Sequence, residues 1–200
     1  MKPDFITVVS GLPRSGTSLM MQMLQAGGLP ALTDGLRSAD ENNLRGYLEY
    51  EPVKRLRVDR SWLPQARGHV VKIIHVLLRE LLLDGTLQYR IVFMQRPIAE
   101  VIASQHSMLQ REGKAGADPA VLTKAFESQL AQVQAWLGNQ PAIAVLPISY
   151  HRVVSEPQAM AAELAGFLGL PLNSAAMVQA VVPALHRQRK TSAGADLARP

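Results

Sequence analysis

The sequence predicts a three-layer α/β protein in which helices cover both faces of a mainly parallel sheet. The prediction follows from short apolar runs that alternate with longer segments of helical periodicity. The apolar runs cover residues 5–9, 70–74, 90–95 and 143–148. Runs of this length that are rich in β-branched residues are typical of strands covered on both faces.

The segments between these runs carry apolar residues at the spacing of amphipathic helices. In the first of them, Leu19, Met23 and Ala26 are expected to face the core, and Gly27-Gly28 should end the helix. A short strand is expected at residues 29–33. Helices are expected at residues 17–26, 51–58, 76–83, 98–110, 119–137 and 156–168.

The composition limits the classes of function. With 48% hydrophobic residues in a chain of 200, we expect one domain over residues 1–190 and a loose tail over 191–200. There is no Cys and the five His residues are scattered, so no metal site is predicted. The net charge of +5 favours anionic partners, but 5% aromatic residues offer little stacking surface for nucleic acid. No membrane span or signal peptide is apparent, and a cytoplasmic location is expected.

Residues 11–18, GLPRSGTS, connect the first strand to the first helix and have the composition of an anion-binding loop. The first amides of a helix have no partner within the helix and point at such a loop. Arg14 adds a permanent positive charge. Hydroxyl donors come from Ser15, Thr17 and Ser18. Gly11 and Gly16 have the spacing of the Walker loop, but Thr17 stands in place of the Walker Lys.

A second group of polar residues follows the strand at residues 90–95. Arg96 ends this strand, at the sheet edge where open α/β proteins bind ligands. Pro97 begins a helix, and Ser104 lies two turns along it. Two turns span about 10 Å, so a phosphate that contacts Arg96 and Ser104 would lie beside the helix.

These two motifs resemble those of sulfotransferases that use 3'-phosphoadenosine 5'-phosphosulfate (PAPS), including small bacterial-type members with a P-loop-like fold. GLPRSGTS resembles their 5'-phosphosulfate loop, and IVFMQRPIAEVIASQHSML resembles their 3'-phosphate motif. The resemblance implies that Arg96 and Ser104 bind the 3'-phosphate, and that Arg14 also stabilises the leaving group. It implies that the phosphosulfate is bound by Arg14, Ser15, Gly16, Thr17 and Ser18.

The C-terminal part of the chain adds two weaker matches. Residues 148–154 and the FLGL run at 167–170 resemble the family's Y-E-D-L segment and the sequence that follows it. The resemblance implies that Tyr150, at the end of the fourth strand, contacts the nucleotide, whereas His151 departs from the usual acidic residue. It also implies that Arg187 and Arg189 close over the 3'-phosphate; a solvated basic surface is the alternative.

The reaction implied is in-line sulfuryl transfer to a hydroxyl or an amine, without metal, and its general base has several candidates. Asp34 is the first, because protein-tyrosine sulfotransferases carry a Glu at about this position. Glu41 or Asp40 is the second, by similarity to polysaccharide sulfotransferases. His75 is the third, by similarity to cytosolic ones, with a core histidine as the alternative. Each acid has a structural alternative in loop solvation or helix capping.

Other functions are compatible with an anion-binding α/β fold. A P-loop small-molecule kinase or nucleotide hydrolase is disfavoured, because the Walker Lys is absent and no acid at a strand end could bind Mg²⁺. A non-catalytic protein that binds PAPS, or the product 3'-phosphoadenosine 5'-phosphate (PAP), would share both motifs. Nucleic-acid binding is permitted only by the basic charge, and it should be steeply salt-dependent.

Overall fold

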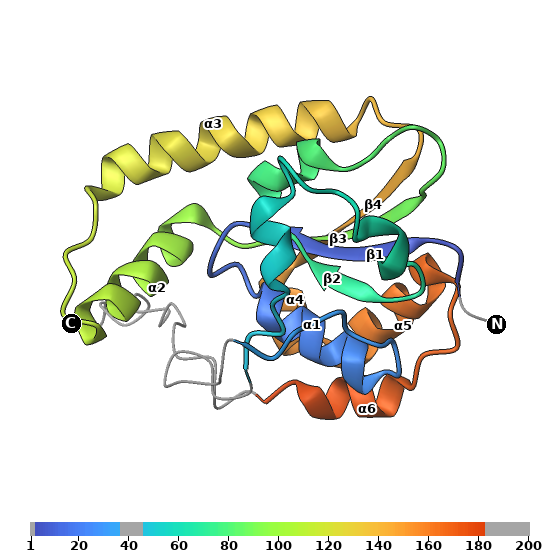
Figure 1. Ribbon diagram of the computed structural model, residues 1–200. Helices are drawn as coiled ribbons and strands as arrows, with labels where there is room; N and C mark the ends of the chain where they lie inside the picture. Colours follow the sequence, from blue (N-terminus) through green and yellow to red (C-terminus); the bar gives the residue numbers. More distant parts are fainter. Residues whose placement is uncertain (1–2, 37–45, 183–200) are drawn as a thin grey trace, which may run out of the picture.

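The computed structural model describes residues 3–36 and 46–182, in which four strands form one parallel sheet (Figure 1). The strand order is β2-β1-β3-β4, and all three pairs of neighbours are parallel. The strands are β1 Ile6–Gly11, β2 Val70–Lys72, β3 Tyr89–Gln95 and β4 Ile143–Ser149. The predicted parallel α/β fold is therefore confirmed.

The helices lie in two layers around this sheet. Helix α3 covers one face, helices α1, α5 and α6 lie against the other, and α2 extends from the carboxyl edge of the strands (Figure 1). The α-helices are α1 Thr17–Ala26, α2 Ile98–Arg111, α3 Pro119–Leu137, α4 Tyr150–Ser155, α5 Pro157–Leu168 and α6 Ser174–Ala180. Short 3₁₀ helices are η1 Glu51–Arg55, η2 Leu63–Ala66 and η3 His75–Glu80.

Several elements differ from the sequence prediction. The helices expected at 51–58 and 76–83 are the short 3₁₀ helices η1 and η3. The strand expected at 29–33 is a single bridge, in which Ala31 pairs with Val70. Its neighbours bond elsewhere: the amide of Leu29 donates to the carbonyl of Leu24, and the hydroxyl of Thr33 donates to the carbonyl of Glu49. The amide of Leu32 donates to the carbonyl of Val70, and the amide of Val70 donates to the carbonyl of Pro30, so the pairing is one bridge long.

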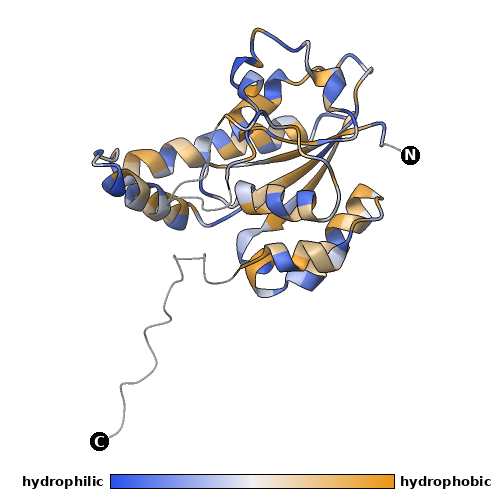
Figure 2. Cartoon of the chain, turned by 60° about the horizontal axis from the view of Figure 1, so that its bottom comes forward, coloured by the Kyte–Doolittle hydropathy of each residue, from blue (hydrophilic) through white to orange (hydrophobic). Residues whose placement is uncertain are grey.

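Each face of the sheet contributes to a separate apolar cluster, and Figure 2 shows the mainly hydrophobic strands between the helices. One cluster joins Ile91 to α3 and the 3₁₀ helices, and the other joins Val92 to α1 and α5. Residues that follow one another in a strand point to opposite faces, which explains the continuous apolar runs.

The buried face of α1 differs from the predicted one. Ala26 is exposed, so this assignment is wrong, whereas Leu19 is partly buried and packs against the apolar cluster, as predicted. The apolar face is rotated because the helix packs against α6 as well as against the sheet. Its buried residues are Met20, Met21, Met23 and Leu24.

Arg90 connects β3 to the end of α5. Its Nη1 donates to the carbonyl of Phe167 at 3.1 Å and also to that of Leu168, both in the last turn of α5. Its guanidinium lies 4.0 Å from the centre of the Phe5 ring. A cation at a helix C-terminus satisfies carbonyls that have no partner within the helix and complements the helix dipole. Arg90 thus fixes α5 against the sheet.

Candidate functional site

The loop at residues 11–18 turns sharply between β1 and α1, and two glycines make this turn possible. Gly11 and Gly16 have φ values of 144° and 103°, which side-chain-bearing residues rarely adopt. A Cβ on Gly11 would lie 2.6 Å from the carbonyl oxygen of Met94. A Cβ on Gly16 would lie 2.5 Å from Cδ2 of Tyr150. The loop therefore packs directly against β3 and α4.

The loop ends at the N-terminus of α1, where the predicted phosphosulfate-binding residues lie. Gly16 is the N-cap residue and has no side chain with which to cap the helix. The Ser15 side chain is buried, and its Oγ has no hydrogen-bond partner within the described part of the chain. Thr17 and Ser18, in the first turn, are partly exposed. This arrangement presents helix amides and hydroxyls to one small volume, as an anion site requires.

The two predicted anion motifs are in contact. Nε of Arg14 donates to Oγ of Ser104 in α2 at 3.2 Å, and Nη1 of Arg96 donates to the carbonyl of Arg14 at 3.2 Å. Ser104 is buried, and the Arg96 side chain is only 6% exposed. The structure thus links Arg14, Arg96 and Ser104, which come from two separate motifs.

Arg96 is held from three directions. Its Nε donates to Oε2 of Glu100 at 3.1 Å, and its guanidinium lies 4.3 Å from the centre of the Tyr150 ring. With the bond to the Arg14 carbonyl, these contacts fix the plane of the guanidinium. Glu100 is absent from the sequence prediction, although an acid four residues after an Arg in a predicted helix is a recognisable pairing signal.

Tyr150 lies in the site, but at the start of a helix. Tyr150 is buried. Strand β4 ends one residue earlier, at Ser149, and Tyr150 is the first residue of α4, so the expectation that Tyr150 ends a strand is wrong. At this position its ring packs against both Gly16 and Arg96. The adjacent His151 is half-exposed, and its Nε2 lies 3.1 Å from Oε1 of Glu100.

Lys72 brings a further cation to the loop, at the end of β2. Its side chain is 9% exposed, and its Nζ lies 3.2 Å from Oε1 of Glu49 and 3.4 Å from Oγ of Ser18. Nζ also donates to the carbonyl of Tyr47 at 2.5 Å. The sequence predicts a strand over residues 70–74, with Lys72 in its middle, whereas β2 ends at Lys72; the contact with Ser18 is not apparent from the sequence.

Asp34 lies at the surface, where its carboxylate accepts backbone hydrogen bonds. Oδ2 accepts from the amide of Glu51 at 2.6 Å and Oδ1 from that of Leu36 at 3.1 Å. The bond from Glu51 is the main reason why the pKa of Asp34 is below its ordinary value. A carboxylate with a lowered pKa is a weaker base. The helix-capping alternative for Asp34 thus has direct geometric support at η1.

The remaining predicted residues lie elsewhere. His75 is buried, and its Nε2 contacts Oε1 of Gln129 on α3 at 2.9 Å, within the apolar cluster on that face. Asp40 and Glu41, and Arg187 and Arg189, lie outside the described residues. Within the described part no three His, Cys, Asp or Glu side chains are grouped as metal ligands, and no helix is long and apolar enough to cross a membrane.

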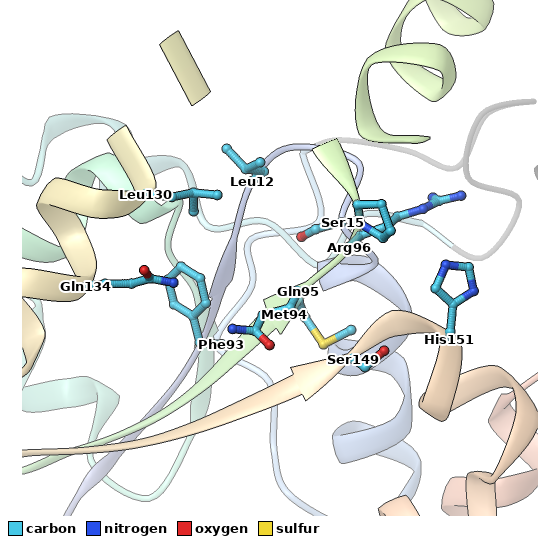
Figure 3. A pocket seen from close by; sticks show the side chains of 11 residues that line it. Leu12, Ser15, Phe93, Met94, Gln95, Arg96, Leu130, Gln134, Ser149 and His151 are labelled. Atoms are coloured by element: carbon cyan, nitrogen blue, oxygen red, sulfur yellow. The ribbon is translucent and has the colours of Figure 1, made fainter. Parts of the chain in front are cut away.

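A cavity of about 310 Å³ lies at the carboxyl ends of β3 and β4. Ser15, Arg96 and His151 line one side of it, and Leu12 and Leu130 line another (Figure 3). This cavity adjoins the loop and Arg96, so there is open volume beside the cations at this edge of the sheet.

No protein-family model and no curated protein matches the chain. Solved structures that are similar to it include sulfotransferases. One from Mycobacterium tuberculosis has a TM-score of 0.57 and 17% identity, over 90% of this chain and 71% of that one. The sulfotransferase domain from the curacin biosynthetic pathway has a TM-score of 0.53 and 16% identity, over 90% and 78%. A mouse sulfotransferase complexed with PAP has a TM-score of 0.51 and 16% identity, over 89% and 62%.

At this level of identity the likeness concerns the fold. The chain has the P-loop-like α/β fold of the sulfotransferases, which is the fold that the two motifs predict.

Proposed function

We propose that the protein is a sulfotransferase that transfers a sulfuryl group from PAPS to a hydroxyl or an amine. One observation carries this proposal: Arg14, Arg96 and Ser104, from two separate motifs, form one hydrogen-bonded network at the N-terminus of α1. The shared fold supports the proposal independently of the motifs.

The residues present fit a nucleotide with a 5'-phosphosulfate and a 3'-phosphate. At α1, uncapped helix amides and the buried hydroxyl of Ser15 face the loop, with Arg14 and Lys72 as cations. At the second position, Arg96 is fixed in orientation, and both Arg96 and Ser104 contact Arg14. Two cationic positions joined through Arg14 match the two anionic ends of PAPS.

The bound co-substrate supplies the sulfuryl group and a phosphate leaving group. The task of the protein is then to position the reactants and to neutralise charge, as in phosphoryl transfer. We assign to Arg14 and the first amides of α1 the stabilisation of the negative charge that develops on the departing phosphate. Lys72, which pairs with Glu49, contacts Ser18 at the same place.

The general base is proposed among the acids predicted from the sequence. Asp34 is ionised at neutral pH, as a base must be, but its two backbone hydrogen bonds lower its basicity. Glu41 and Asp40 rest on the resemblance alone. His75 contacts Gln129 in the apolar cluster, which supports a structural role for it.

The proposal is tested by calorimetric titration in EDTA with PAP and with the same nucleotide lacking the 3'-phosphate. We expect the second nucleotide to bind at least about tenfold more weakly, which corresponds to about 1.4 kcal/mol. Arg96→Ala should remove this preference. Arg57→Ala is the matched control, because it deletes an exposed Arg that pairs with Glu80.

Equal affinity for the two nucleotides, or no binding of either, would overturn the proposal. ATP turnover that requires Mg²⁺ would instead favour a kinase or a nucleotide hydrolase. Selective PAP binding without sulfuryl transfer to any of a panel of hydroxyl and amine acceptors would favour a non-catalytic PAP-binding protein.

A further inference from the structure

Glu100 shares its carboxylate between two basic side chains from different elements. Oε2 accepts from Nε of Arg96 at the end of β3, and Oε1 lies 3.1 Å from Nε2 of His151 in α4. The Glu100 side chain is only 12% exposed, so little water is available to replace either partner. The orientation of the carboxylate therefore depends on both contacts.

The sharing of Glu100 limits how it engages Arg96. A carboxylate that can turn freely prefers to bind a guanidinium with both oxygens, through two parallel hydrogen bonds. On the side of Nε those bonds would involve Nε and Nη2. In this structure only Oε2 contacts Nε, because Oε1 is directed to His151. Nη1 is directed to the carbonyl of Arg14.

We propose that His151 is a positioning residue for the 3'-phosphate site, acting through Glu100. By contacting Oε1 of Glu100, His151 limits the contact of Glu100 with Arg96 to one nitrogen, Nε. The Arg96 guanidinium then keeps the orientation in which it contacts the carbonyl of Arg14 and the Tyr150 ring. Without His151, the carboxylate turns to take two nitrogens of Arg96 and competes with the 3'-phosphate. This inference rests on the proposed function, since it concerns the nucleotide's 3'-phosphate.

The other charged groups near His151 are engaged elsewhere or act through the same network. Arg152, its neighbour in α4, pairs with Glu156 at 3.4 Å and with Glu163 at 3.3 Å. The Tyr150 ring, centred 5.8 Å from the His151 ring, lies against the Arg96 guanidinium. Glu100 is therefore the acid through which His151 reaches Arg96.

Because His151 lies at the surface, a replacement can change ligand binding without disturbing the folded core. Its side chain is 50% exposed, so a variant should fold, and a loss of binding would not reflect a damaged core. The imidazole contacts Glu100 through Nε2, a position that the amide nitrogen of Gln can also reach. A Gln at this position can thus hold Glu100 without carrying a charge.

The experiment measures 3'-phosphate selectivity, the ratio of the Kd of the nucleotide lacking the 3'-phosphate to that of PAP. We expect His151→Ala to reduce this ratio by roughly threefold to tenfold, which lies within the range for partners in one hydrogen-bonded network. His151→Gln should restore most of it. In a Glu100→Gln background, His151→Ala should have no further effect. His69→Ala, which removes a His before β2, is the control.

Each outcome separates this inference from the proposed function. Unchanged selectivity in His151→Ala would overturn the inference and leave the sulfotransferase proposal standing. An equal loss in the presence and absence of Glu100 would also overturn it, because His151 would then act directly on the ligand. If the unchanged protein does not distinguish PAP from the nucleotide lacking the 3'-phosphate, the proposed function fails, and the role assigned to His151 fails with it.

Discussion

Arg14 and Ser104 lie 90 positions apart in the chain and are joined by a hydrogen bond of 3.2 Å between Nε and Oγ. Arg14 belongs to the loop after β1, and Ser104 to α2. The bond means that neither anion motif is independent of the other. If Ser104 binds a phosphate as proposed, a shift of Ser104 toward it would also move the Arg14 guanidinium.

Ser104→Ala tests this connection. The substitution leaves Arg14 without this acceptor, so we expect PAP affinity to fall by roughly threefold to tenfold. The free energy of unfolding should change by about 1 kcal/mol, the usual contribution of one hydrogen bond. Calorimetry and urea unfolding measure the two effects. Ser128→Ala, on the exposed face of α3, is the control. Equal PAP affinity in both variants would contradict the expectation.

Gly16→Ala and Gly28→Ala separate backbone strain from steric clash. Both glycines have positive φ values, 103° and 98°, so both variants should lose about 1–2 kcal/mol of stability. Only at Gly16 would the new Cβ meet Tyr150; around Gly28 there is nothing within 4 Å. We therefore expect a larger loss in urea unfolding, and the loss of PAP binding, for Gly16→Ala alone. Similar behaviour of the two variants would argue against the packing of Tyr150 on the loop.

Arg90→Met tests how far α5 depends on the sheet. Met keeps an apolar stem but loses the hydrogen bonds to the last carbonyls of α5 and the contact with Phe5. We expect a loss of about 2–3 kcal/mol in the free energy of unfolding, with PAP affinity of the folded protein unchanged. Arg57→Met, on an exposed Arg, should have little effect. A small loss for Arg90→Met would show that α5 is held by its apolar face alone.

Asp34→Asn distinguishes the two roles of Asp34. Because the folded-state pKa is lowered, the ionised Asp34 contributes stability above its unfolded-state pKa of about 3.9. That stability is lost as the pH falls through the folded-state pKa. We expect Asp34→Asn to be less stable than the unchanged protein at pH 7, and the difference to disappear in acid. Urea unfolding at several pH values measures it.

The same variant tests Asp34 as the base. A general base contributes about 10²–10⁴-fold to the rate, so a loss of that size in kcat would establish the catalytic role. An unchanged kcat would leave Asp34 as a cap of η1. Asp84→Asn is the control, because Asp84 accepts hydrogen bonds from Thr86 in a similar exposed turn.

The elements that the sequence predicts well have signals within their own residues. Helix α3 has the predicted bounds, because Asp118 caps its first amides and Pro119 occupies its first position. Helices α4 and α6 are missing from the prediction. Each has no more than seven residues, and helices this short depend on tertiary packing for stability.

In the candidate site, too, some residues are predictable from local sequence signals and others depend on tertiary contacts. Arg14, Arg96 and Ser104 belong to motifs that can be read along the chain, and the structure brings them together. Lys72 and Glu100 were missed because their importance depends on which side chains they meet. Those partners come from elements whose relative position the motifs do not specify.

The order of the strands has a consequence for how the protein folds. β1 lies between β2 and β3, so its parallel partners come from distant parts of the chain, and the Arg96–Arg14 bond spans 82 positions. Contacts of this range form slowly, because a long loop must close before they are gained. The proposed nucleotide site can therefore form only after most of the sheet has formed. A ligand that binds there would bind the folded chain and not a partly folded one, and it would therefore stabilise the whole sheet.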